Sequence, residues 1–234
     1  EESGTRADSA GSNTLTDNNT VTQNDGVALV DARDGENVRR RVDLSGNAKH
    51  AIQTGNVITK PLFVTGSIND KPVIRHNSDY LTFSGEGAGF SFTNFTYLLI
   101  YQRTTDTGAV EILFDNRDSA ADGFSIQIDA NDKVSVIYNA ITVTGTTSFT
   151  VGVPRIITVV ADGTNITIYL NGVQDGQAAQ SGSIAETADA GIGARNFTSQ
   201  TNFAIGDYAE DALWNRGLNA GELNRLHRYL GRKW

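Results

Sequence analysis

Residues 166–172, Ile-Thr-Ile-Tyr-Leu-Asn-Gly, carry the clearest evidence for the fold class of this chain. Ile166, Ile168 and Leu170 alternate with less apolar neighbours, which is the period of a β-strand with one buried face. Asn171-Gly172 follows at once, and this dipeptide favours the two-residue turn of a β-hairpin because both residues tolerate positive φ. The stretch therefore predicts a strand that turns back on itself.

The same strand signals recur on the N-terminal side of this hairpin. Phe124, Ile126 and Ile128 alternate with polar residues, and the stretches 134–138 and 156–160 are rich in β-branched residues. The turn dipeptides that separate them are Asp122-Gly123, Asn131-Asp132 and Asp162-Gly163. Many short strands at a spacing of roughly 8–12 residues are typical of a β-sandwich and not of a βαβ fold. We therefore predict an all-β domain.

One helix is expected, near residues 220–230. Asn219 suits its N-cap and Glu222 its third position, which together form a capping box. We expect its apolar face to lie against the sandwich as a latch, and Gly231 to end it. The apolar face consists of Leu223, Leu226 and Leu230. The basic residues that suit the negative end of the helix dipole are Arg228, Arg232 and Lys233.

The composition limits the classes to which the chain can belong. Of 234 residues, 38% are hydrophobic and 20% charged, and 24 glycines accompany 3 prolines, which is the profile of a globular domain with many turns. The net charge of −8 disfavours nucleic acid as a partner. No stretch reaches the ~18 consecutive apolar residues of a membrane helix, so we expect no membrane insertion. The absence of cysteine excludes disulfides, zinc-thiolate sites and thiol nucleophiles.

The first 36 residues differ from the rest. Residues 1–36 are polar and acidic, with short apolar pieces such as Val27–Val30, and they predict an arm with a first irregular strand. Residues 37–234 then form the sandwich with its latch helix. An extended arm can add a strand to a neighbouring copy, which makes a homo-oligomer one expectation. The chain begins at Glu1 without methionine, which we interpret as a processed product or a fragment.

Several short motifs, taken in order, resemble one known family, the bacterial and phage laminin-G-like, concanavalin A-like jelly-roll domains. The motifs are Arg6-Ala7-Asp8, residues 42–47 with Ala51-Ile52-Gln53, residues 71–75 with Tyr80-Leu81, and residues 168–173 with 206–216 and Tyr229-Leu230. One departure is Arg41, which stands where the family usually has tryptophan, inside Arg39-Arg40-Arg41. The resemblance implies a jelly-roll β-sandwich that is extracellular or virion-associated, often binds glycans and sometimes carries calcium.

The sequence offers little for catalysis. His50, His76 and His227 share no metal-ligand spacing, and no Gly-x-Ser-x-Gly elbow accompanies them. A glycoside hydrolase needs two facing carboxyl groups about 5–9.5 Å apart. Glu210 and Asp211 are adjacent on a predicted strand, so they point to opposite faces, and we interpret Glu210 as structural. We therefore predict that the protein is not an enzyme.

One loop has the composition of a calcium site. Asp115, Asn116 and Asp118, with Asp122 close behind, concentrate oxygen ligands in one loop, which suits a hard cation such as Ca²⁺. The spacing does not match an EF-hand. Clusters of Asp and Asn in β-rich proteins more often form plain turns, and we rank that interpretation first.

A glycan site needs an exposed aromatic ring with Asn, Asp or Arg beside it, on loops at one edge of the sandwich. The candidates that suit this are Arg195, Asn196, Phe197, Asp207 and Tyr208. Trp214 falls inside the last strand and is expected in the core, and Trp234 is expected to cover the latch. The run Arg39–Arg41 suits either the carboxylates of a partner or a solvated strand edge.

These features favour a non-catalytic extracellular recognition or adhesion module that binds carbohydrate. The alternative is a structural subunit of a virion, such as a decoration or fibre protein, or of an extracellular filament, whose partners are neighbouring subunits. A polysaccharide hydrolase or lyase ranks third. A hydrolase lacks a confident pair of carboxylates, and a lyase would have to use His50 or His76 with a tyrosine such as Tyr80 or Tyr138.

Overall fold

The computed structural model describes most of the chain. It describes residues 33–44, 50–53, 60–83, 91–119, 122–185, 189–195 and 200–234, together with the backbone of four short strands before residue 30. These strands are β1 (Arg6–Ala7), β2 (Thr14–Leu15), β3 (Thr22–Asn24) and β4 (Val27–Leu29). β1 pairs with β2, and β3 pairs with β4, so the described strands of the predicted arm are paired within the chain. Assembly through this arm stays a prediction.

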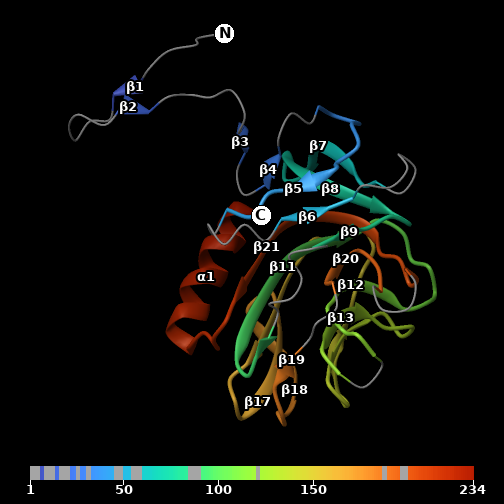
Figure 1. The fold of residues 1–234 in the computed structure, drawn as a ribbon, viewed down its shortest axis with the longest axis vertical. Coiled ribbons are helices and arrows are strands. Elements are labelled where there is room, and N and C mark those ends of the chain that lie inside the picture. The colour runs from blue at the N-terminus through green and yellow to red at the C-terminus, as the bar shows by residue number, and fades with distance from the viewer. Residues whose placement is uncertain are drawn as a thin grey trace.

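Two antiparallel sheets form the body of the protein (Figure 1). The eight-stranded sheet has the order β15-β14-β13-β12-β20-β9-β6-β5. Its strands are β5 (Arg40–Arg41), β6 (Ala51–Ile52), β9 (Leu81–Thr82), β12 (Glu111–Asp115), β13 (Phe124–Ile128), β14 (Lys133–Tyr138), β15 (Ile141–Ser148) and β20 (Gly191–Ile192). A separate pair joins β10 (Ser91–Phe92) to β19 (Ile184–Ala185).

The second sheet has seven strands in the order β18-β17-β16-β11-β21-β8-β7. They are β7 (Leu62–Ile68), β8 (Lys71–Asn77), β11 (Phe95–Arg103), β16 (Arg155–Ala161), β17 (Asn165–Leu170), β18 (Val173–Ala179) and β21 (Ile205–Trp214). The two sheets face each other around one core, and spatial neighbours such as β11 and β21 lie far apart in sequence. The predicted jelly-roll β-sandwich is confirmed.

The alternating runs occupy the core as predicted. Phe124, Ile126 and Ile128 of β13 are fully buried on the inner face of the eight-stranded sheet, and the apolar residues of β17 meet them from the seven-stranded sheet. Between β17 and β18, Asn171 and Gly172 have φ of 52° and 83°. Positive φ at both central residues suits the right-handed twist of the two strands, which explains why Asn-Gly occupies this turn.

The seven-stranded sheet is covered on both faces. Helix α1 (Ala220–Lys233) lies on its outer side, next to β11 and β21 (Figure 1). Leu98 and Ile100 of β11 pack with Leu230 and Trp234 of the helix end, whereas odd-numbered residues of β11 enter the main core. No helix among the described residues is long and apolar enough to cross a membrane.

The latch helix begins as predicted and ends later. Asn219 and Glu222 form the capping box, with the Glu222 N–H donating to Asn219 Oδ1 over 3.1 Å. The prediction that Gly231 ends the helix is wrong, because the helix continues to Lys233. Trp234 closes the last turn by donating its backbone N–H to the Leu230 carbonyl over 2.8 Å, and its buried indole anchors that turn to the sheet.

Candidate functional site

The predicted glycan residues do not form an exposed platform. Asn196 and Phe197 lie outside the described residues, and Arg195 is half-buried in a short bridge to Thr201. Asp207 and Tyr208 were expected on a loop, but both lie in β21 and are fully buried. The placement of these two residues on a loop is therefore wrong.

The position of β21 explains this burial. β21 lies between β11 and β8, so neither of its edges is free in this region. Tyr208 points into the core and donates its hydroxyl to the Leu113 carbonyl over 3.2 Å. Asp207 points the other way and accepts from Arg75 Nε at 2.7 Å and Nη2 at 2.8 Å. Asp207 therefore joins two strands.

Side-chain oxygen atoms of the predicted calcium loop accept hydrogen bonds from the protein itself. Asp115 Oδ1 accepts from Arg117 Nε at 2.8 Å, and Asn116 Oδ1 accepts from the Phe124 N–H at 2.7 Å. Asp122 Oδ1 accepts from the Ser119 N–H at 2.8 Å, while Asp118 is exposed. The described residues contain no group of three or more His, Asp or Glu that could hold a metal ion. Calcium binding at this loop stays a prediction.

The two acidic residues of the last strand lie on opposite sides of the sheet, as their parity predicts. Glu210 faces α1, where its Oε2 accepts from Lys233 Nζ at 2.9 Å and from Trp234 Nε1 at 3.0 Å. Asp211 faces the other way, where it pairs with Arg41 and accepts from the Tyr97 hydroxyl at 3.2 Å. Glu210 therefore joins β21 to the end of α1, and these two carboxylates do not face each other across a cleft.

His76 is buried in β8. Its Nδ1 lies 2.8 Å from Asp79 Oδ1, and its ring centroid lies 4.6 Å from that of Tyr208. Only 1% of the residue is exposed, so a polymer cannot reach it without moving the surrounding core. His227 lies on the latch helix itself and is half-buried against β16, where its Nε2 lies 2.9 Å from Thr158 Oγ1. Burial lowers the pKa of His227.

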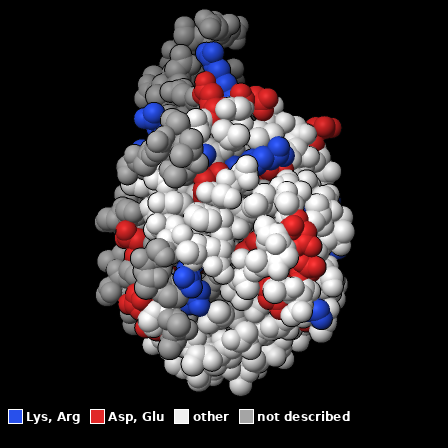
Figure 2. Space-filling model, turned by 90° about the vertical axis from the view of Figure 1, so that its right-hand side faces the viewer, with Lys and Arg blue, Asp and Glu red and all other residues white. Residues whose placement is uncertain are grey.

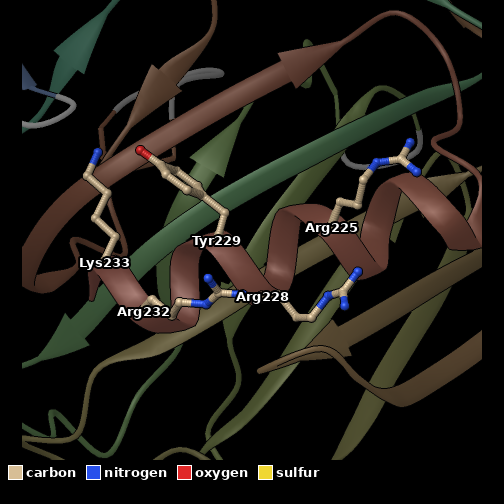
Figure 3. Close-up of a pocket in the computed structure, with 5 residues that line it drawn as sticks. All are labelled: Arg225, Arg228, Tyr229, Arg232 and Lys233. Carbon is tan, nitrogen blue, oxygen red and sulfur yellow. The ribbon is translucent and has the colours of Figure 1, made fainter.

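An exposed aromatic ring with arginines beside it does occur, on the outer face of α1. Tyr229 is the most exposed large aromatic residue in the described part of the chain, at 57%. A shallow hollow of about 500 Å³ adjoins it, a size within the range of ligand sites. Its lining consists of Arg225, Arg228, Tyr229, Arg232 and Lys233, which we call the helix face (Figure 3).

Helical geometry gathers these side chains. Arg225, Arg228, Tyr229 and Arg232 stand at i, i+3, i+4 and i+7, and residues at this spacing share one side of a helix. The buried leucines hold the opposite side against the sheet, so the helix face points to solvent. Lys233 Nζ lies 5.8 Å from the centroid of the Tyr229 ring.

The basic residues of the helix face differ in whether they form an ion pair within the protein. The ion pairs of α1 among the described residues are Arg216–Glu222 and Lys233–Glu210. Arg225, Arg228 and Arg232 thus form no direct ion pair in the part of the chain that the structure describes, although the charge of Arg225, after the hydrogen bonds from Arg216, also helps to lower the pKa of Glu222. Arg228 Nε donates only to the Asn224 carbonyl, at 3.2 Å. Three exposed guanidinium groups therefore remain for a ligand.

The face on the other side of the molecule differs. Figure 2 shows small, separate groups of acidic and basic side chains there, over a mostly uncharged surface. The concentration of arginine on α1 is thus a local feature of an otherwise acidic chain, whose net charge is −8. The helix dipole alone accounts for Arg228, Arg232 and Lys233 as cations near a helix C-terminus, but it does not predict this face. The spacing of Arg225, Arg228, Tyr229 and Arg232 was the signal that would have revealed it.

Comparison with known families gives one match over most of the chain. Residues 75–224 match the family model described as the concanavalin A-like lectin/glucanases superfamily. No curated protein sequence matches the chain.

Solved structures share the fold at low sequence identity. The binding domain of Paraclostridial Mosquitocidal Protein 1 is 19% identical with a TM-score of 0.63, over 84% of this chain and 51% of that one. A Bacteroides ovatus ATCC 8483 protein assigned to carbohydrate binding is 14% identical with a TM-score of 0.56, over 65% and 46%. The NanB sialidase from Streptococcus pneumoniae is 17% identical with a TM-score of 0.53, over 64% and 26%. This chain spans about half the length of the first two and less of the third.

Proposed function

Because the chain belongs to the concanavalin A-like lectin/glucanases superfamily, we propose that it is a non-catalytic module that binds carbohydrate outside the cell. The fold alone does not decide this, since one fold hosts many functions. The observation that carries the proposal is the helix face, where an exposed tyrosine adjoins three arginines that form no direct ion pair with the described residues. The names of two similar structures, the binding domain of a mosquitocidal protein and a protein assigned to carbohydrate binding, support it.

The chemistry of the helix face suits a sugar. The C–H face of a sugar ring is apolar and can pack on the exposed ring of Tyr229, as apolar groups pack on aromatic rings elsewhere. Arginine donates several hydrogen bonds in a fixed plane, which suits hydroxyl and carboxylate oxygens. The hollow is open along the helix, so a polymer can lie across it.

The acidic residues of the last strand support the non-catalytic part of the proposal. General acid–base hydrolysis of a glycosidic bond needs two carboxyl groups on either side of the sugar. Glu210 and Asp211 lie on opposite faces of the sheet, and each is engaged by basic or hydroxyl groups of the protein. We therefore expect binding without release of reducing ends or unsaturated products.

Binding to a panel of polysaccharides tests this function. We expect the folded protein to bind at least one glycan of the panel, Tyr229→Ala to weaken that binding, and Tyr229→Phe to retain it because the ring remains. Failure of the folded protein to bind any glycan contradicts the proposed function. Unchanged binding by Tyr229→Ala contradicts the assignment of the site to the helix face.

A further inference from the structure

Resting on the proposed carbohydrate-binding function, we infer that the helix face takes an anionic polysaccharide with a carboxylate on successive sugars, a polyuronate. The inference starts from charge. Arg225, Arg228 and Arg232 are exposed and form no direct ion pair among the described residues, although the chain carries 27 acidic residues against 19 lysines and arginines. A neutral sugar would leave Arg228 and Arg232 without a counter-charge among the described residues, and Arg225 with only the charge of Glu222, which already pairs with Arg216.

The spacing of the arginines suits a polymer with separated charges. At 1.5 Å of rise per residue, Arg225 and Arg228 are about 4.5 Å apart along the helix axis, and Arg228 and Arg232 about 6 Å. These intervals are comparable to the length of one sugar unit in a chain. An arginine can bind a carboxylate through two parallel N–H donors. A polyuronate along the helix therefore presents one carboxylate near each arginine while a ring packs on Tyr229.

Nucleic acid fits this face less well. Duplex DNA carries one negative charge per about 1.7 Å of its axis, which is denser than three arginines along this helix. The remaining surface of a chain with net charge −8 repels a polymer of that density. A polyuronate has fewer charges per unit length than duplex DNA, so it meets less repulsion from the remaining acidic surface.

An anionic membrane also fits less well. Helices that lie on membranes insert an apolar face between the lipids. The apolar face of α1 is instead buried on the seven-stranded sheet, where Leu223 and Leu230 are 6% and 1% exposed. Tyr229 is the one large apolar side chain that the helix leaves exposed.

Lys233 has a different role from the three arginines. Its ammonium group lies 2.9 Å from Glu210 Oε2, so its charge is already offset within the protein. Its contact with Glu210 and the Tyr229 ring fixes the end of the hollow. We therefore assign carboxylate binding to the arginines alone.

The test compares polygalacturonate with its methyl ester, which has the same backbone without the charge. We expect the protein to bind polygalacturonate at least about tenfold more tightly, because hydrogen bonds between charged groups are the strong ones. Binding should weaken as salt is raised, since exposed charges are screened. Equal affinity for the two polymers, without salt dependence, overturns this inference and leaves the proposed function intact. Binding to no glycan at all overturns both.

Two triple variants locate the site. Arg225→Gln/Arg228→Gln/Arg232→Gln should lower the affinity for polygalacturonate by about tenfold or more. Gln keeps the helix propensity close to that of Arg, and circular dichroism should show both variants folded. The control, Arg33→Gln/Arg39→Gln/Arg40→Gln, removes the same charge from three exposed arginines outside the helix and should bind like the parent. Loss of binding in the control with none in the helix variant overturns the inference.

Two further ligands cover the other classes. Heparin tests whether sulfate replaces carboxylate, and vesicles of phosphatidylcholine and phosphatidylserine test the membrane. We expect weaker binding to both than to polygalacturonate. Binding to either one through the same arginines, without binding to polygalacturonate, overturns the assignment to a polyuronate.

Discussion

Replacing Leu230 by alanine tests whether α1 is held on the sheet as the structure has it. Leu230 is 1% exposed and packs in a cluster with Leu98, Ile100 and Trp234. Removing a fully buried leucine side chain costs its transfer free energy and leaves a cavity, about 3 kcal/mol together. For a chain of this length that loss corresponds to a fall in melting temperature of roughly 6–12 °C.

Urea denaturation followed by tryptophan fluorescence and circular dichroism measures the effect. We expect a lower midpoint and an unchanged slope m, because the surface exposed on unfolding stays nearly the same. Leu226→Ala is the matched control, since Leu226 lies on the same helix but is only half-buried, and it should lose less. A change of less than about 0.5 kcal/mol for Leu230→Ala, which is the scale of a surface substitution, would refute the docking of the helix end.

Three other outcomes are expected. Burial lowers the pKa of His227 below 6.5, so the unfolded state binds the proton more readily and stability falls as the pH drops through 6.5. His227→Gln should therefore lose less stability than the parent between pH 7 and pH 5. Equal losses would show that His227 does not contribute to the pH dependence. Because oxygen atoms of Asp115, Asn116 and Asp122 already accept hydrogen bonds in their loop, the melting temperature should not change between EDTA and millimolar Ca²⁺, whereas a rise would establish a calcium site. Because the described strands of the arm pair with each other, removing residues 1–32 should not change the number of subunits, as measured by light scattering. A smaller oligomer would show that the arm joins copies.

Local signals predicted the strands and the start of the helix. The alternation of Phe124, Ile126 and Ile128 and the Asn171-Gly172 turn depend on backbone preferences and on one buried face, and both appear as expected. The capping box at Asn219 is equally local, because its two hydrogen bonds join residues three apart. The end of the helix depends instead on a contact with residues distant in sequence. Trp234 anchors the last turn to the sheet, and this contact outweighs the tendency of Gly231 to end a helix.

The candidate site was predicted less well. Asp207 and Tyr208 look like loop residues beside Gly206, but their strand is placed between two others, which buries both. The helix dipole explains Arg228 and Arg232 without a binding role, and it gives no reason to single out Arg225. Side-chain spacing indicates that these residues share a face, but spacing does not reveal whether that face meets solvent or another element.

The all-β sandwich with one C-terminal helix follows from the amino-acid sequence, because strand period, turn residues and helix caps are properties of neighbouring residues. The placement of the helix on the outer side of the seven-stranded sheet, which leaves Arg225, Arg228, Tyr229 and Arg232 facing solvent, follows from tertiary packing. Tertiary packing also decides that Glu210 is held by Lys233 and Trp234, more than 20 residues away in sequence. Such pairings depend on which strands become neighbours, and burial of the whole core sets that order.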